Sequence, residues 1–169
     1  MSELPSFVID EQTVAEVDEL ASVPSDIEGY LSLTMETMRS KHGSLYQLIR
    51  NTAQNQKDWS AYALAVSLTF DMIDRQLEKE EMTIRITDAD LESYSQLVLE
   101  CMIPEISPQG DMTYAPDFSE HLEKIEATSP EFMTYVVNVC FEVFEDHASR
   151  GSFIRGVCDV AVPFFHKLQ

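Results

Sequence analysis

The chain of 169 residues carries 30 acidic side chains against 11 basic ones, which gives it a net charge of -19 at pH 7. A field of that sign repels nucleic acid and anionic lipid and attracts basic surfaces, so we expect neither direct nucleic-acid binding nor membrane association. With 44% hydrophobic residues, the chain has enough apolar material for one domain, and no apolar run approaches the ~20 residues of a membrane span. The N-terminus also lacks the basic and apolar regions of a signal peptide, which favours a cytoplasmic protein.

The acidic excess is unevenly distributed along the chain. Residues 1–38 include acidic side chains but no Lys or Arg, residues 39–86 are nearly balanced, and acids predominate again in residues 87–169. A basic partner should therefore be attracted more strongly by the two ends of the sequence than by its middle.

The N-terminal segment has two interpretations. Phe7, Val8 and Ile9 precede an acidic stretch with one apolar helical face, which consists of Val14, Val17, Leu20 and Ala21. Residues 1–24 could form an acidic arm that is mobile in isolation or docks into a partner's groove, with residues 25–169 as a single helical domain. Alternatively, the same stretch is the first helix of that domain and packs on it.

Two capped helices are predicted next. Ser25-Asp26-Ile27-Glu28 fits a capping box, and Gly43 is expected to end the helix that follows. Ser44 to Gln47 forms a second box before a short helix that runs toward Ala53.

A long helix is predicted over residues 58–79. Asp71, Asp74 and Glu78 lie on its polar side, where they could form half of a carboxylate-bridged metal site. Such sites require Glu-x-x-His pairs, which this chain lacks, whereas Arg75 is placed to pair with the carboxylates. We therefore expect an ion-pair ladder and no metal. The apolar stripe of the helix should face the core and consists of Tyr62, Ala65, Val66, Thr69, Met72, Ile73 and Leu77.

Residues 82–87 alternate between apolar and polar side chains, which suits either a short strand or an extended linker. Residues 6–9 or 112–114 could pair with such a strand. A helix should then begin near Thr87. The acids Asp88 and Asp90 resemble the start of a calcium loop, but the sequence lacks the glycine and the final glutamate of that loop, and the helix macrodipole explains acids at this position.

The C-terminal third is predicted to contain three helices after a loop that extends to Pro116. The first covers residues 117–127. Ser129-Pro130 should cap a strongly apolar second helix, which we expect to be the most buried and to form the centre of the fold with residues 58–79. Pro163 should kink or split the third helix.

No catalytic signature is found. Cys101, Cys140 and Cys158 lie singly in apolar surroundings and are expected to be small buried hydrophobes instead of nucleophiles. There is no glycine-rich phosphate loop. The sequence therefore predicts no enzyme, no cofactor and no metal.

The predicted fold is mostly α: a compact, bundle-like domain of six to eight helices with at most a minor β element near residues 82–87. The leading functional hypothesis is a non-enzymatic module whose acidic surface docks on a basic surface of a partner. That partner could be a nucleic-acid-binding protein that the module inhibits or regulates by nucleic-acid mimicry. The acids expected to take part lack a nearby base in sequence: Glu11, Glu16, Asp18, Glu19, Asp26, Glu28, Asp88, Asp90, Glu92, Glu120, Glu123, Glu142, Glu145 and Asp146.

Two alternatives remain open. The first is a structural or scaffold subunit of a larger assembly, in which methionines and the aromatic C-terminal stretch from Phe164 to Gln169 make adaptable contacts. The second is a small enzyme whose site assembles from residues that are distant in sequence. The sequence predicts no particular oligomeric state.

Overall fold

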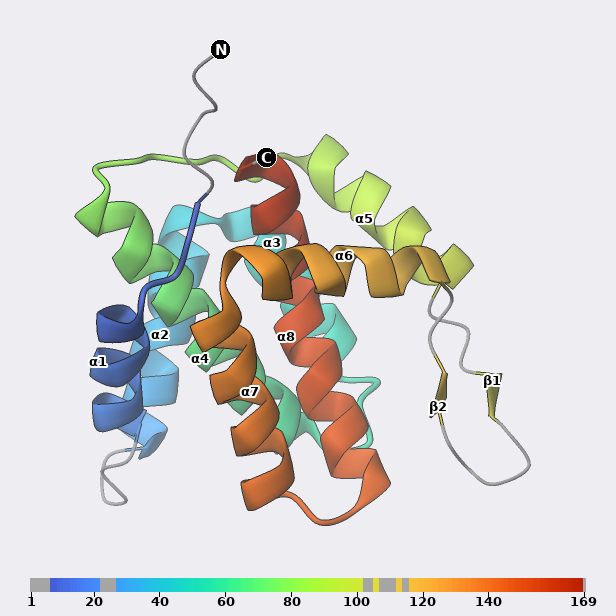
Figure 1. Ribbon diagram of the computed structural model, residues 1–169. Helices are drawn as coiled ribbons and strands as arrows, with labels where there is room; N and C mark the ends of the chain where they lie inside the picture. The colour runs from blue at the N-terminus through green and yellow to red at the C-terminus, as the bar shows by residue number, and fades with distance from the viewer. Residues whose placement is uncertain (1–6, 22–26, 102–104, 107–111, 114–115, 169) are drawn as a thin grey trace.

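The computed structural model describes residues 7–21, 27–101, 105–106, 112–113 and 116–168, and the side chains of residues 7–21, 27–97 and 122–168 (Figure 1). These residues form a mostly α, bundle-like domain, which confirms the predicted fold class. Within them the chain forms eight helices and one short strand pair: α1 (Glu11–Ala21), α2 (Ile27–Lys41), α3 (Gly43–Ala53), α4 (Trp59–Lys79), α5 (Asp88–Cys101), β1 (Glu105–Ile106), β2 (Met112–Thr113), α6 (Pro116–Thr128), α7 (Pro130–Val143) and α8 (His147–Leu168).

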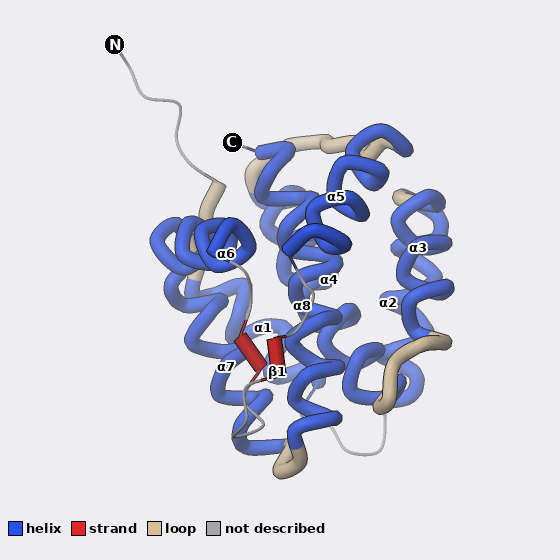
Figure 2. Tube along the Cα trace, turned by 90° about the vertical axis from the view of Figure 1, so that its right-hand side faces the viewer, coloured by secondary structure: helices blue, strands red, loops and turns tan. Residues whose placement is uncertain are grey.

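The centre of the fold is the parallel pair of α4 and α8. The backbone N–H of Asp58 donates to the Ser152 hydroxyl at one end (3.2 Å), and the rings of Phe70 and Phe164 meet at the other, 6.3 Å apart. The apolar stripe predicted for residues 58–79 is buried along its whole length. The remaining helices surround this pair, as the two views in Figures 1 and 2 show.

The prediction that the apolar helix after Ser129 is the most buried one is wrong. Of the helix α7, only Phe132, Val136 and Cys140 are buried, whereas Val137 and Phe141 are 45% and 58% exposed. The central position belongs to α8, which buries side chains on almost every side over its C-terminal half. A high apolar content does not decide which of two helices lies inside, because that choice depends on the shape of their partners.

Residues 7–21 pack against the domain. The ring centroid of Phe7 lies 5.7 Å from that of Phe165, and Ile9 has no exposed surface. The Thr13 hydroxyl donates to Gln76 Oε1 on α4 (2.7 Å). The apolar face of α1 thus packs on the domain, as expected if the segment is the first helix of that domain. Docking of this segment into a partner's groove stays a prediction.

Two of the predicted helix starts are confirmed. Asp58 Oδ1 accepts a hydrogen bond from the backbone N–H of Ala61 (3.1 Å) at the start of α4. At α5, the Thr87 N–H donates to Asp90 Oδ2 (2.8 Å) and the Asp90 N–H donates to Thr87 Oγ1 (3.2 Å). This reciprocal pair is a capping box, which explains the clustered acids without a calcium ion.

Two local predictions are wrong. Gly43 does not end α2; it is the first residue of α3, with His42 as the N-cap and no side-chain cap bond in place of the expected box at Ser44. Ser129 is the N-cap residue of α7 and Pro130 begins the helix, as predicted, but the Ser129 side chain makes no cap bond; its Oγ accepts from the Ile9 N–H (3.0 Å). The expected cap at Ser25 lies outside the described residues.

Residues 82–87 form an extended linker and not a strand. Their alternation reflects packing, since Ile86 is buried and Ile84 half-buried while their polar neighbours face outward. The strand pair lies elsewhere: Glu105 is opposite Thr113 and Ile106 opposite Met112 in an antiparallel arrangement. The minor β element was therefore predicted at the wrong place.

Pro163 does not split α8, which continues to Leu168. The turn after the proline is held by aromatic contacts. Phe164 packs edge-on against His42 (5.1 Å between ring centroids), and Phe165 stacks on Phe132 (6.4 Å). These buried contacts offset the backbone hydrogen bond that the proline cannot donate.

The close approach of α4 and α8 can be tested at Gly156. A Cβ atom there would lie 2.7 Å from the Tyr62 carbonyl oxygen and 2.9 Å from Ala65 Cβ. Gly156→Ala should therefore lower the free energy of unfolding by about 1–3 kcal/mol through overpacking. Thermal unfolding should show this as a loss of Tm of about 2–4 °C per kcal/mol. The matched control is Gly43→Ala, where a Cβ meets nothing within 4 Å and Tm should stay or rise. Equal Tm values for the two variants would contradict the close approach.

Candidate functional site

Helices α1 and α7 lie side by side and run parallel. The Ile9 N–H meets Ser129 at one end, and the Tyr135 hydroxyl donates to Asp18 Oδ1 (3.0 Å) further along. On α7, Glu131 and Glu142 share the side of Tyr135, because residues four and seven positions apart lie on one helical face.

On α1, Glu11 shares the side of Asp18 for the same reason. We call Glu11, Asp18, Glu131 and Glu142 the α1–α7 acidic face. All four side chains are exposed. None of them forms an ion pair with another of the described residues. The face therefore presents uncompensated negative charge to solvent.

The other acids of α1 have different surroundings. Glu16 lies 3.4 Å from Lys79 Nζ on α4, and Asp10 lies 3.8 Å from the same atom. These partly exposed pairs attach α1 to α4 and reduce the local charge. Glu19 is exposed near the end of α1.

A second group of acids lies where α7 turns into α8. Glu145 and Asp146 are exposed, and Asp146 accepts from the backbone N–H of Ser149 (2.8 Å), which lowers the pKa of its carboxyl. The Ser149 hydroxyl lies 2.5 Å from Asp58 Oδ2 and 2.9 Å from Asp146 Oδ2. Asp146 thus serves to cap α8.

The remaining predicted acids are scattered. Asp88, Asp90 and Glu92 begin α5, on the opposite side of the molecule from α1 in Figure 1. The backbone hydrogen bond from Thr87, followed by the bond from Lys167, lowers the pKa of Asp90 to about 2. Glu28 lies on α2 and Glu123 on α6, both exposed. Asp26 and the side chain of Glu120 lie outside the described part of the chain.

The predicted acids therefore do not form one continuous surface. The structure joins α1 and α7 through Asp18 and Tyr135, and helical spacing places Glu11 on the side of Asp18 and Glu131 and Glu142 on the side of Tyr135. The sequence reasoning did not select Glu131 and Tyr135. A usable signal was present, since Glu142 follows Glu131 by 11 positions, about three helical turns, which places both on one face.

The carboxylate stripe of α4 forms ion pairs, as predicted, although one partner differs. Arg75 Nε pairs with Asp71 Oδ1 (2.9 Å). Glu78 and Asp74 pair instead with Lys41 of α2, at 3.2 and 3.0 Å from Nζ. The residues that the structure describes contain no group of three His, Cys, Asp or Glu side chains arranged to hold a metal ion.

Both described cysteines are buried. Burial raises the pKa of the Cys140 thiol, although Arg150 opposes this, and burial also raises that of Cys158. Both thiols stay protonated at neutral pH, whereas a nucleophilic cysteine needs a lowered pKa and access to substrate. The side chain of Cys101 is not among those described.

A buried polar network crosses the core. The carboxylate of Asp159 accepts hydrogen bonds from the Tyr62 hydroxyl (2.7 Å), the Tyr94 hydroxyl and Arg155 Nε (2.8 Å). Burial raises the pKa of Asp159, and these donors oppose that effect. Because Asp159 is 1% exposed and its oxygens are occupied, the network ties α4, α5 and α8 together and offers no reactive group to a substrate.

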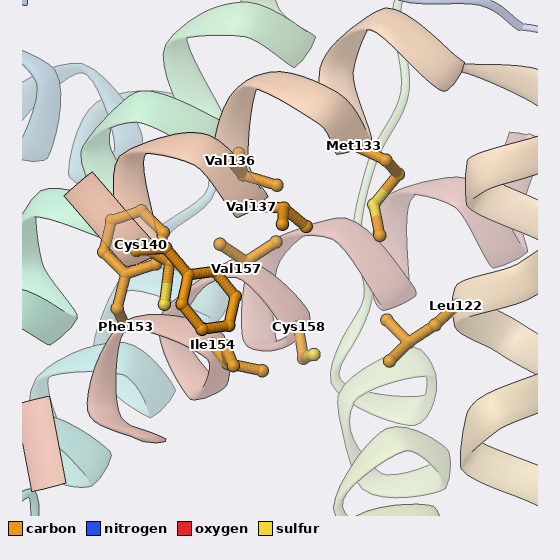
Figure 3. Close-up of a pocket in the computed structure, with 10 residues that line it drawn as sticks. Leu122, Met133, Val136, Val137, Cys140, Phe153, Ile154, Val157 and Cys158 are labelled. Atoms are coloured by element: carbon orange, nitrogen blue, oxygen red, sulfur yellow. The ribbon is translucent and has the colours of Figure 1, made fainter. Parts of the chain in front are cut away.

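An apolar groove lies between α6, α7 and α8, on a different side of α7 from the acidic face. Its volume is about 180 Å³. Figure 3 shows side chains of α7 and α8 facing each other across it, with Leu122 of α6 at one end. The lining contains no charged residue and consists of Leu122, Met133, Val136, Val137, Cys140, Phe141, Phe153, Ile154, Val157 and Cys158.

A wider groove of about 680 Å³ lies between α2, α3 and α4. Trp59, which is 66% exposed, and Tyr46 contribute aromatic surface, and Glu28 and Arg50 add opposite charges. This mixed lining gives the groove no single chemical preference.

No protein-family model, curated protein or solved structure matches this chain. None of the helices in the described part of the chain combines the length and the hydropathy that crossing a membrane requires.

The buried His42 makes a pH dependence testable. Its ring lies between Phe70 and Phe164, and burial lowers its pKa from the ordinary value of 6.5, with Asp74 opposing and Lys41 adding to this effect. The imidazole of His42 therefore binds a proton more readily in the unfolded chain than in the folded one. The stabilising contribution of neutral His42 is present above pH 6.5 and is lost as the pH falls below that value.

We expect Tm to fall between pH 7.5 and pH 5, and to fall less in His42→Leu than in the wild type, as measured by circular dichroism. His147→Gln, which changes an exposed imidazole, serves as the control. The same pH dependence in the wild type and His42→Leu would refute the role of His42.

Proposed function

We propose that this chain is a non-enzymatic interaction protein that docks its α1–α7 acidic face on a basic surface of a partner protein. The observation that carries this proposal is the exposure of Glu11, Asp18, Glu131 and Glu142 on two parallel helices, without ion pairs among the described residues. Unpaired carboxylates on a rigid surface attract basic partners and raise the rate of association.

The partner class that fits best is a nucleic-acid-binding protein, because such proteins carry the largest basic surfaces. The chain would then act as an inhibitor or regulator in the cytoplasm by covering the surface that nucleic acid uses. Glu131 and Glu142 are about 16 Å apart along α7. A duplex presents about 10 phosphates over that length. The face therefore resembles part of a phosphate array and suits a basic patch better than a full duplex channel.

The alternatives receive less support. An enzyme using a cysteine would need an accessible thiolate, and both described thiols are buried. A scaffold subunit was expected to use the aromatic C-terminal stretch, but Phe164 and Phe165 are 0% and 2% exposed and serve the core.

The partner should first be identified by purifying the tagged protein from its source cells at low and at high salt and determining which proteins co-purify. We then expect charge reversal on the acidic face, Asp18→Lys with Glu142→Lys, to weaken binding of that partner more at low salt than at high salt. Reversing these two charges should reduce the association rate at low salt by about tenfold or more, as measured by surface plasmon resonance.

The matched control is Glu36→Lys with Glu80→Lys, which changes the net charge equally at exposed positions of α2 and after α4. If both pairs of reversals have the same effect, only the net charge matters and the acidic face is not the docking site.

A further inference from the structure

Helix α7 carries an apolar stripe that the other described elements cover only in part. Met133, Val137 and Phe141 follow one another at intervals of four residues, so they lie on one side of the helix. Exposed fractions of 45% for Val137 and 58% for Phe141 are high for such side chains. Clustered exposure of this kind marks an interaction site more often than isolated apolar residues do.

The stripe forms one wall of the groove between α6, α7 and α8. Ile154 and Val157 of α8 form the opposite wall (Figure 3). Because a closed apolar cavity of about 150 Å³ can hold benzene, a groove of about 180 Å³ has room for one large apolar side chain. It therefore suits an anchor residue and not a whole cofactor.

The surroundings of the groove are acidic. Glu126 lies one turn after Leu122 on α6 and is exposed. Glu145 and Asp146 extend the negative charge at the turn into α8.

The two nearby arginines are engaged within the domain. Arg150 Nε donates to the Phe144 carbonyl (2.8 Å), with its guanidinium 4.6 Å from the centre of the Phe141 ring. Arg155 Nε donates to Asp159 (2.8 Å). The charge of Arg155 is balanced by Asp159, whereas Arg150 leaves one positive charge over Phe141. The other described charges near the groove include the exposed carboxylates of Glu126, Glu145 and Asp146.

We propose that the α6–α7–α8 groove binds a basic amphipathic helix of the partner. Apolar residues at positions i, i+3 or i+4, and i+7 of that helix enter the groove beside Val137 and Phe141. Its Lys and Arg side chains meet Glu126 on α6 and the exposed acids Glu145 and Asp146 at the turn into α8. This inference rests on the proposed function, because it names the kind of segment through which the basic partner is held.

A second copy of this chain fits the groove less well. Each copy has a net charge of -19, and a two-fold contact through α7 would bring the acids of one rim against the same acids of the other. Like charges placed face to face oppose such an association.

The test uses two labelled synthetic peptides of about 18 residues made only of Leu and Lys. In the first, Leu recurs with helical spacing and forms one apolar face; the second has the same composition in a shuffled order without such a face. Fluorescence anisotropy should show that the wild type binds the first peptide at least about tenfold more tightly than the second, since buried anchors dominate affinity.

The variants Val137→Ala and Phe141→Ala should each reduce this preference, and the double variant should abolish it. Both side chains are largely exposed, so little core packing is lost. Leu33→Ala on α2 is the matched control, since Leu33 is 69% exposed and lies outside the groove. A second readout is an NMR titration of the wild type with the first peptide. Binding should shift the methyl signals of Ile154, which lies on the opposite wall of the groove.

The outcomes separate this inference from the proposed function. If the double variant keeps the full preference for the amphipathic peptide, the groove is not the binding site and the inference fails. The proposed function would still stand if both peptides bind in a salt-dependent way that Asp18→Lys with Glu142→Lys weakens. If neither peptide binds the wild type, both the inference and the proposed function fail.

Discussion

The contact between α4 and α8 is the constraint on which the rest of the structure depends. It requires a residue without a side chain at Gly156, where the backbone of Tyr62 comes too close for a Cβ atom. Once these two helices are in contact, Asp159 is carried into the core, where only hydrogen bonds from Tyr62, Tyr94 and Arg155 make its burial tolerable. The same contact therefore fixes α5 through a polar network as well as through apolar packing.

The central pair also explains why α7 lies at the surface. With α8 occupying the interior, α7 buries one narrow side and keeps two others exposed: a polar side next to α1 and an apolar side next to α6 and α8. Attachment of α1 through Ile9 and Tyr135 then adds Glu11 and Asp18 to the polar side. Charge and apolar surface thus occur on adjacent sides of one helix, an arrangement that allows electrostatic attraction and apolar anchoring to act on a single partner.

The sequence was sufficient for features that depend on near neighbours. The buried stripe of α4 and the starts of α4 and α5 near Asp58 and Thr87 depend on residues within a few positions of one another, and the structure has them as predicted. Features that depend on distant residues were not predictable. Ser129 was expected to cap its own helix, but its hydroxyl accepts from Ile9, 120 positions away. The two tyrosine partners of Asp159 lie 65 and 97 positions away, and no local sequence pattern indicates them.

The position of Trp59 has an optical consequence. It is the only tryptophan of the chain, it stands at the first turn of α4, and two thirds of its surface is in water. Its indole emission therefore reports little about the packed interior, and unfolding should change that emission only modestly. The same ring lines the wide groove between α2, α3 and α4. Intrinsic fluorescence of the unmodified protein is consequently a sensor for molecules that enter that groove, independent of events on the opposite, α7 side.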